Sequence, residues 1–119
     1  MSNGHNNWDV SYSYITFLEK LLNGHRNISS VVRTDDILFH VKRVKQEDTL
    51  KILCLDEYSM SIAAVIRAMD EFPGVSIISV GGNWNKYTHS AKRHCIESRV
   101  GLVNSKEINQ ALFRTKYWL

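Results

Sequence analysis

Apolar residues near the start of the chain recur three and four positions apart, which is helical spacing. This pattern predicts an amphipathic helix that begins at Asp9 and ends at the turn-forming pair Asn23-Gly24. Such a helix buries one side against the rest of the protein. The apolar face that we predict for it contains Val10, Tyr14, Phe17, Leu18 and Leu21.

The next part of the chain favours strands. Residues 28–33 and 37–44 are rich in β-branched and aromatic residues. The pair Asp35-Asp36 between them is typical of a turn, because aspartate bonds readily to its own backbone. Residues 50–55 form a short, almost continuously apolar run, as in a strand that is covered on both faces. We therefore expect three neighbouring strands, of which at least the last two form a hairpin.

The middle of the chain returns to helical spacing. Residues 59–72 predict a helix that starts at a Ser59 or Ser61 cap. Pro73-Gly74 ends it, because proline blocks continuation of a helix and glycine permits the chain to reverse. The apolar face that we predict for this helix contains Ile62, Val65, Ile66 and Met69.

A strand–helix–strand–helix pattern completes the chain. Residues 75–80 predict a strand, residues 88–98 a helix and residues 100–103 a short strand. Asn104 and Glu107 have the spacing of a capping box and predict a final helix. Alternating strands and helices favour a parallel sheet segment with right-handed crossovers. The expected fold class is α/β, a small three-layer α/β/α domain with a mixed central sheet and the order αβββαβαβα.

The length and composition suit one globular domain. A chain of 119 residues can bury one hydrophobic core, and we expect a flexible tail over residues 1–8 and a single α/β domain over residues 9–119. Hydrophobic residues make up 44% and charged residues 23%, which argues against disorder. No apolar run approaches the roughly 20 residues that cross a bilayer, so no membrane partner is expected. The polar start lacks the features of a secretory signal, which predicts a cytoplasmic protein.

Cysteines and histidines give no sign of a zinc site. Cys54 and Cys95 each fall within an apolar pattern, so we expect two reduced, packed thiols, with a disulfide as the alternative. The histidines show no paired metal-ligand spacing with the cysteines. The five histidines are His5, His25, His40, His89 and His94.

Positive charge is concentrated in the second half of the chain. The net charge is +3, and residues 60–119 carry eight Lys and Arg against four Asp and Glu. Several of these basic residues lie in the 14-residue segment 86–99, which contains one acidic residue, Glu97. The cluster is either a solvated helix face or a surface that contacts phosphates, which needs positive charge on one side. Lys42, Arg43 and Lys45 extend it if the fold brings them close. The cluster contains Lys86, His89, Lys92, Arg93, His94 and Arg99.

Two further segments are candidates for binding or catalysis. Asp56-Glu57 follows the predicted buried strand, where open α/β sheets place ligand groups, although acids also suit the start of the next helix. Gly81-Gly82 follows a strand and allows close backbone approach. After the glycines in the sequence come Trp84 and Tyr87. These aromatic residues either stack on a base or partner surface or hold the loop against the core.

The order of predicted elements resembles the core of the restriction-endonuclease-like superfamily. The second half is most similar to its Mrr and Holliday-junction-resolvase branches, in which a strand ends in a glycine or polar turn before an aromatic residue and a helix. Here these features are residues 75–82, Trp84 and the segment Thr88-His89-Ser90-Ala91-Lys92, followed by residues 99–103 and Glu107-Ile108. The resemblance covers residues 10–113 and implies a metal-dependent nuclease core.

The active site that the resemblance implies is incomplete in this sequence. The family has an Asp early in the hairpin and Glu-x-Lys on the next strand, where the carboxylates hold Mg²⁺ and the lysine orients water. Asp36 matches the first acid. Cys54-Leu55-Asp56 stands where Glu-x-Lys is expected, whereas His40-Val41-Lys42 keeps the lysine without the acid and belongs to the earlier strand. The motif is therefore degenerate.

Three functions remain as hypotheses. The first is a nuclease-like domain with a degenerate catalytic motif that binds nucleic acid, DNA or RNA, or serves in assembly, without a cofactor. The second is an active Mg²⁺-dependent nuclease that uses Asp36, Asp56, Glu57 and Lys42, with Asp36 and Asp56 as the metal ligands. The third is a non-enzymatic interaction domain that forms a homodimer through Tyr117, Trp118 and neighbouring apolar surface.

Overall fold

A five-stranded mixed sheet forms the centre of the computed structural model, which describes residues 8–82 and 85–119. The helices are α1 (Tyr12–Asn23), α2 (Ile62–Glu71), α3 (His89–Glu97) and α4 (Ile108–Ala111). The strands are β1 (Ile28–Thr34), β2 (Leu38–Arg43), β3 (Thr49–Cys54), β4 (Ser59–Met60), β5 (Ile77–Ser79), β6 (Lys86–Tyr87) and β7 (Gly101–Val103).

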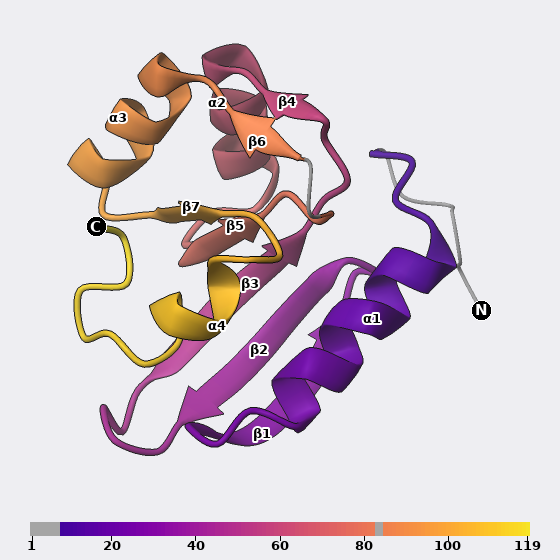
Figure 1. Ribbon diagram of the computed structural model, residues 1–119, viewed down its shortest axis with the longest axis vertical. Coiled ribbons are helices and arrows are strands. Elements are labelled where there is room, and N and C mark those ends of the chain that lie inside the picture. The colour runs from indigo at the N-terminus through magenta and orange to yellow at the C-terminus, as the bar shows by residue number, and fades with distance from the viewer. Residues whose placement is uncertain (1–7, 83–84) are drawn as a thin grey trace.

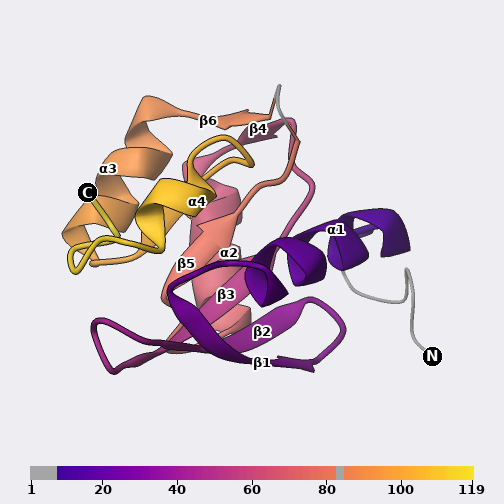
Figure 2. The ribbon, with the colours of Figure 1, turned by 60° about the horizontal axis from the view of Figure 1, so that its bottom comes forward.

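Helices cover both faces of this sheet, whose strand order is β1-β2-β3-β5-β7. Helices α1 and α4 lie on one face, and α2 and α3 lie on the other (Figures 1 and 2). Two successive crossovers, β3-α2-β5 and β5-α3-β7, proceed in one direction across the sheet. Because both are right-handed, α2 and α3 lie on the same side of it. The predicted α/β class, with three layers and a mixed sheet, is therefore confirmed.

The first half of the sheet is an antiparallel meander. Asp35 and Asp36 both have positive φ angles, and the Ile37 backbone N–H donates to the Asp35 carbonyl, so the predicted turn joins β1 to β2. Strands β2 and β3 pair from Leu38↔Leu53 to Lys42↔Thr49. A bulge between Ile28 and Ser30 shifts the register of the outer strand β1. Strand β3 belongs to both halves of the sheet, so the meander fixes the edge on which the parallel strands pair.

The second half of the sheet is parallel and buried. Strands β5 and β7 are only three residues long, and every residue in them is buried, as expected for strands covered by helices on both faces. Ile52 pairs with Ile77, which in turn pairs with Gly101. The predicted capping box also forms, because Glu107 accepts the Asn104 N–H while Asn104 Oδ1 accepts the Glu107 N–H. The final helix, α4, is short: it begins at Ile108 and ends at Ala111.

The faces of the first two long helices differ from the predicted ones. The buried stripe of α1 is Ile15, Leu18 and Leu22, whereas Phe17 is 53% exposed. Each helix buries the stripe of side chains that best fits the neighbouring elements. Helical spacing alone was also compatible with the predicted stripe, which is rotated from the buried one by about one residue. In α2, Val65 and Ala68 are buried while the predicted core residues Ile62 and Ile66 are exposed.

The strands β4 and β6 form a separate two-stranded parallel pair that the sequence did not predict. Ser59, expected as a possible helix cap, lies in β4 instead and pairs with Lys86. The α2 cap is Ser61, whose hydroxyl accepts the Ala64 N–H. Two-residue strands are too short to leave an alternating pattern in a sequence. The pair fixes β6 directly before α3.

Residues at the start of the described chain are anchored. Trp8 is buried, its indole N–H donates to Glu71 at 3.0 Å, and the Arg67 guanidinium lies 3.9 Å from its ring centre. Trp8 therefore does not belong to a flexible tail, and the other residues of the predicted tail, 1–7, lie outside the described residues. None of the helices in the described ranges combines the length and apolar character needed to span a bilayer.

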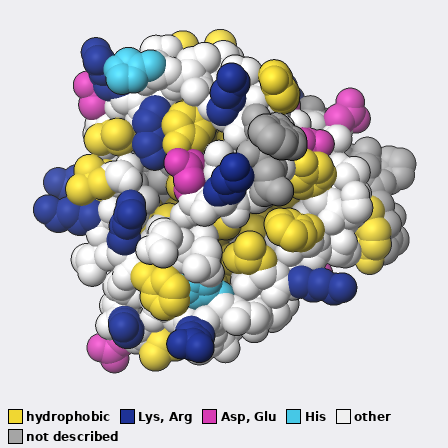
Figure 3. Space-filling view, in the orientation of Figure 1, with side chains coloured by type: hydrophobic (Ala, Val, Ile, Leu, Met, Phe, Trp, Pro, Cys, Tyr) yellow, Lys and Arg dark blue, Asp and Glu magenta, His cyan; other side chains and the backbone are white. Residues whose placement is uncertain are grey.

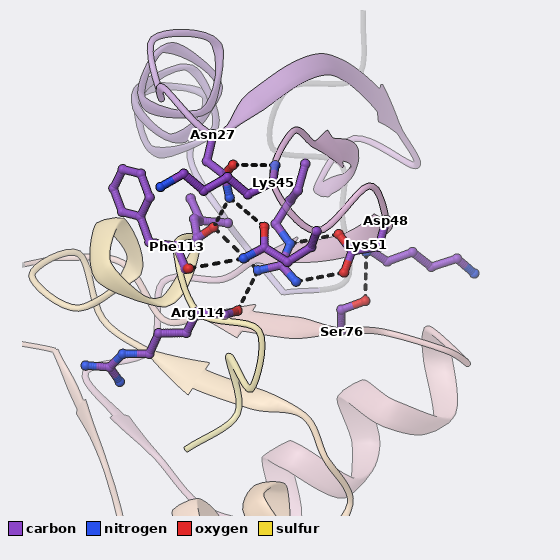
Figure 4. Close-up of polar contacts among 10 residues, drawn as sticks. Asn27, Lys45, Asp48, Lys51, Ser76, Phe113 and Arg114 are labelled. Atoms are coloured by element: carbon purple, nitrogen blue, oxygen red, sulfur yellow. Dashed lines mark hydrogen bonds and ion pairs between the residues drawn. The ribbon is translucent and has the colours of Figure 1, made fainter.

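A buried arginine ties the hairpin to the C-terminal segment. The Arg43 guanidinium forms a two-bond ion pair with Asp48, with distances of 2.8 and 2.7 Å. It also donates to the carbonyls of Leu112 and Arg114, and Asn27 donates to the same Leu112 carbonyl (Figure 4). The Arg43 side chain is completely buried, so these acceptors replace the water that its charge loses.

Both cysteines are buried and unpaired, as expected, so no disulfide links them. Burial raises the pKa of the Cys54 thiol to about 12, and the nearby Asp56 charge adds to this shift. Burial likewise raises the pKa of Cys95 to about 11, against an opposing effect from Lys92. Both side chains are therefore neutral thiols near neutral pH, and neither is a nucleophile in the folded protein.

Replacement of Arg43 tests the tie between hairpin and C-terminal segment. We expect Arg43→Met to lower the free energy of unfolding by about 1–3 kcal/mol, because two carbonyls lose a buried donor while Asp48, which is 38% exposed, keeps access to water. Urea denaturation measures this change. Lys45→Ala is the control, since the contact made by that residue uses its backbone N–H. Equal unfolding midpoints for the two variants would show that the buried ion pair does not stabilise the fold.

The neutral cysteines predict slow alkylation. In the native protein we expect iodoacetamide to label Cys54 and Cys95 far more slowly than in the protein unfolded by urea, because burial excludes the reagent and disfavours the thiolate. Mass spectrometry of samples quenched over time measures both rates. Fast labelling of either residue under native conditions contradicts the described burial.

Candidate functional site

Polar side chains gather where the parallel strands end. Asp56 follows β3, Gly81-Gly82 follow β5, and Asn104 follows β7. The buried Asn85 amide donates to Asp56 Oδ1 at 3.0 Å and to the Val80 carbonyl at 2.7 Å. Asn104 donates to the Asn85 carbonyl at 3.2 Å. This carboxyl edge is the place where open α/β sheets bind ligands, and here its polar groups largely bind one another.

Tyr14 from α1 closes the same edge. An added Cβ at Gly81 would lie 2.5 Å from the Tyr14 ring, so only glycine allows the approach. Burial raises the pKa of Tyr14, and the charge and hydrogen bond of Asp56 raise it further. The Tyr14 side chain therefore lies close to Asp56. An open cavity of about 330 Å³ beside it is lined by Ser13, Tyr14, Phe17, Gly82 and Ser105.

The candidate catalytic residues do not form one group. Asp36 precedes β2 and its carboxylate lies 3.5 Å from Arg33, while Lys42 lies at the opposite end of β2 and pairs with Thr49. Asp56 and Glu57 follow β3 at the Asp36 end of the sheet. Over a strand of six residues the two ends are separated by roughly 15 Å, so the lysine does not reach the acids.

The expected Mg²⁺ site is not supported by its donor set. One Asp56 oxygen accepts from Asn85, and the Asp36 carboxylate faces a cation rather than a second acid. Within residues 8–82 and 85–119, no three His, Cys, Asp or Glu side chains are close enough to hold a metal ion. These residues therefore do not fit the metal that the resemblance implies.

The candidate nucleic-acid-binding residues occupy one side of the molecule. Lys86, His89, Arg93 and Arg99 are exposed on β6, α3 and the turn that follows α3. Arg93 and His89 lie one helical turn apart, with 3.1 Å between their side-chain nitrogens. In the space-filling view, Lys and Arg side chains gather over α3, β6 and α4 (Figure 3). The three candidates from the hairpin do not all extend this side, since Arg43 is buried.

Lys92 differs from the other cations because it is partly buried. Its ammonium donates to the Leu102 carbonyl at 2.9 Å and lies 5.2 Å from the centre of the Tyr87 ring. Burial lowers the pKa of Lys92, and nearby Glu107 opposes that shift. The Tyr87 hydroxyl donates to the Glu107 carboxylate, so Tyr87 belongs to a packed network and not to an exposed loop. Trp84, the other aromatic candidate of this loop, lies outside the described residues.

Two basic residues near α4 were missed from the sequence. Lys106 and Arg114 line a cavity of about 210 Å³ together with Lys92. Their positions, eight apart on either side of Gln110, have helical spacing, and this was the available signal. The sequence did not show that these two residues line one cavity with Lys92. We call the side chains of Lys86, Lys92, Arg93, Arg99, Lys106 and Arg114 the basic surface.

The aromatic residues expected at a dimer interface pack within the chain. Tyr117 and Trp118 form an edge-to-face pair with 5.1 Å between ring centres. The Arg43 guanidinium lies 5.4 Å from the Tyr117 ring, and the Arg99 guanidinium lies 5.7 Å from the Trp118 ring. Both rings are partly buried. Their contacts therefore stabilise the C-terminal segment beside β7.

Comparison with known proteins gives no assignment: no family model, no curated protein and no solved structure matches this chain.

A substitution at Gly81 tests the carboxyl edge. Gly81→Ala places a methyl group against Tyr14 and the Leu55 carbonyl at a φ angle of +75°, so we expect a loss of about 1–3 kcal/mol in stability. Gly24→Ala is the matched control, because its φ angle of −93° suits alanine and its nearest contact is 3.4 Å away. Thermal unfolding of both variants measures the difference. A Gly81→Ala protein as stable as the control would contradict this packing.

Proposed function

We propose that the protein is a nucleic-acid-binding module that contacts phosphates through the basic surface. The observation that supports this most is the meeting of cations from β6, α3 and the two flanks of α4, which are separated in sequence, on one side of the molecule. Lys and Arg contacts to phosphates supply most of the affinity of non-specific nucleic-acid binding. The arrangement favours recognition of the backbone over recognition of bases.

Charge balance on this surface supports the same proposal. Six cations belong to it, whereas the acids of the same segment, residues 86–114, are Glu97 and Glu107. Both oxygens of Glu107 accept a hydrogen bond from Tyr87, and one also accepts from the Asn104 N–H. A surface with this excess attracts a polyanion.

The nuclease-like ancestry implied by the resemblance stays part of this proposal, with a catalytic motif that no longer functions. Lys42 is remote from Asp36 and Asp56, and Asn85 occupies one Asp56 oxygen. The alternative of an active Mg²⁺-dependent nuclease therefore has less support. So does a homodimer through Tyr117 and Trp118, whose rings contact arginines of the same chain. A cytoplasmic location is also proposed, and two unpaired buried cysteines agree with a reducing compartment.

Salt-dependent binding tests the proposed function. We expect a labelled DNA duplex and a single strand to bind with an affinity that falls steeply between about 50 and 200 mM salt. The triple variant Lys86→Ala, Arg93→Ala, Arg99→Ala should bind more weakly, with a salt slope smaller by about 0.9 for each phosphate of the duplex that the variant no longer neutralises. Fluorescence anisotropy over a salt series gives both quantities.

A charge-matched variant controls for net charge. Lys20→Ala, Arg26→Ala, Lys45→Ala removes the same number of cations from α1, the α1–β1 connection and the β2–β3 connection. We expect this variant to keep a salt slope close to that of the unchanged protein. If both triple variants lose affinity equally, the basic surface is not the binding site. If the unchanged protein binds neither DNA at low salt, the proposed function is wrong.

A further inference from the structure

A cavity of about 210 Å³ lies between α3, α4 and the C-terminal segment. Its lining includes three cations, Lys92, Lys106 and Arg114, and one carboxylate, Glu107. Pockets for drug-sized ligands begin at about 300 Å³, so this one suits a smaller group. The cations come from α3 and from both flanks of α4, which means that the folded chain, and not one basic helix, builds the cavity.

Contacts within the chain hold the Lys92 side chain at the wall of this cavity. The Leu102 carbonyl accepts one of its three N–H groups, and the Tyr87 ring lies beside the ammonium. Among the contacts of the described residues, the other two N–H groups have no such acceptor. A partly buried ammonium has lost much of its water, so an anion that reaches it gains more than it would at an exposed lysine.

Glu107 lies near Lys92 and is held by hydrogen bonds from other residues of the chain. Its carboxylate accepts from the Tyr87 hydroxyl at 2.9 and 2.8 Å and from the Asn104 N–H at 3.0 Å. These bonds draw the carboxylate toward the start of α4. The charged side chains of the lining are three cations and one acid. The cavity is thus a recess with an excess of cationic side chains, one of which, Lys92, is held by the Leu102 carbonyl.

We infer that this cavity binds the terminal phosphate monoester of a nucleic-acid strand. A phosphate monoester carries nearly two negative charges near neutral pH, and the three cationic side chains of the lining attract it. An internal phosphodiester carries one, and its two sugars keep it outside a small recess. The exposed cations of the basic surface suit such internal phosphates instead. The inference rests on the proposed nucleic-acid binding and adds preference for a strand end.

Oligonucleotides that differ in one end group test this inference. The probes are a short single strand of one sequence with a 5′-phosphate, with a 3′-phosphate and with hydroxyl groups at both ends. We expect at least one phosphorylated strand to bind about tenfold more tightly than the hydroxyl strand, the effect of one added charge-assisted contact. Inorganic phosphate in excess should abolish this preference at constant ionic strength.

Variants of the cavity locate the effect. Lys92→Met keeps the apolar stem of the side chain, and Arg114→Gln changes an exposed residue, so both should fold, which thermal unfolding checks. We expect each to lose the preference for a phosphorylated end and to retain binding of the hydroxyl strand. Lys116→Gln is the matched control, because this nearby exposed cation does not line the cavity, and it should keep the preference.

The outcomes separate the two proposals. Equal affinity for all three strands overturns the strand-end inference and leaves the proposed function in place. Absence of binding to every strand overturns the proposed function. If inorganic phosphate shifts the NMR signals of cavity residues but no strand end is preferred, the anion site exists for free phosphate and the strand-end assignment is wrong. Preference retained by both cavity variants also overturns it.

Discussion

The buried guanidinium of Arg43 is the interaction on which the arrangement of the C-terminal half depends. A charge without water is costly, so its position is stable only while Asp48 and the carbonyls of Leu112 and Arg114 surround it. Two of those acceptors belong to the segment after α4. That segment carries Arg114 and Tyr117, which line the cationic cavity. One arginine on β2 thereby sets the shape of a surface whose own charges come from other elements.

At the carboxyl edge of the sheet, where open α/β sheets bind ligands, the polar side chains bind one another. Asp56 stands where an open α/β sheet presents a reactive group. Asn85 donates a hydrogen bond to one of its oxygens, and the Tyr14 side chain lies close to it. Gly81 allows the Tyr14 ring to reach this position. Hydrogen bonding within the carboxyl edge therefore accounts for Asp56. The positive charge on α3 and on both flanks of α4 is the feature left to explain by binding.

Local patterns in the sequence predicted the elements well and their contacts less well. The turn at Asp35-Asp36 and the capping box of Asn104 and Glu107 were correct because neighbouring residues determine them. The exposure of Phe17 was not predicted, since helical spacing fixes which residues share a stripe and the neighbouring layer selects the stripe. The distance between Lys42 and the acids depends on strand direction and register, which a motif search ignores. Lys106 was missed for a similar reason, because the fold, and not the sequence around Lys106, brings it to the same cavity as Lys92.

The long separation between Arg43 and its carbonyl partners has a consequence for the order of folding. The meander β1-β2-β3 closes short loops, whereas contacts of Arg43 with Leu112 and Arg114 span 69 and 71 residues. Contacts between distant residues carry a larger loop-closure cost and form later. During synthesis, which proceeds from the N-terminus, the hairpin exists before its C-terminal partners leave the ribosome. Until then Arg43 stays hydrated, and the cationic cavity is among the last parts of the molecule to mature.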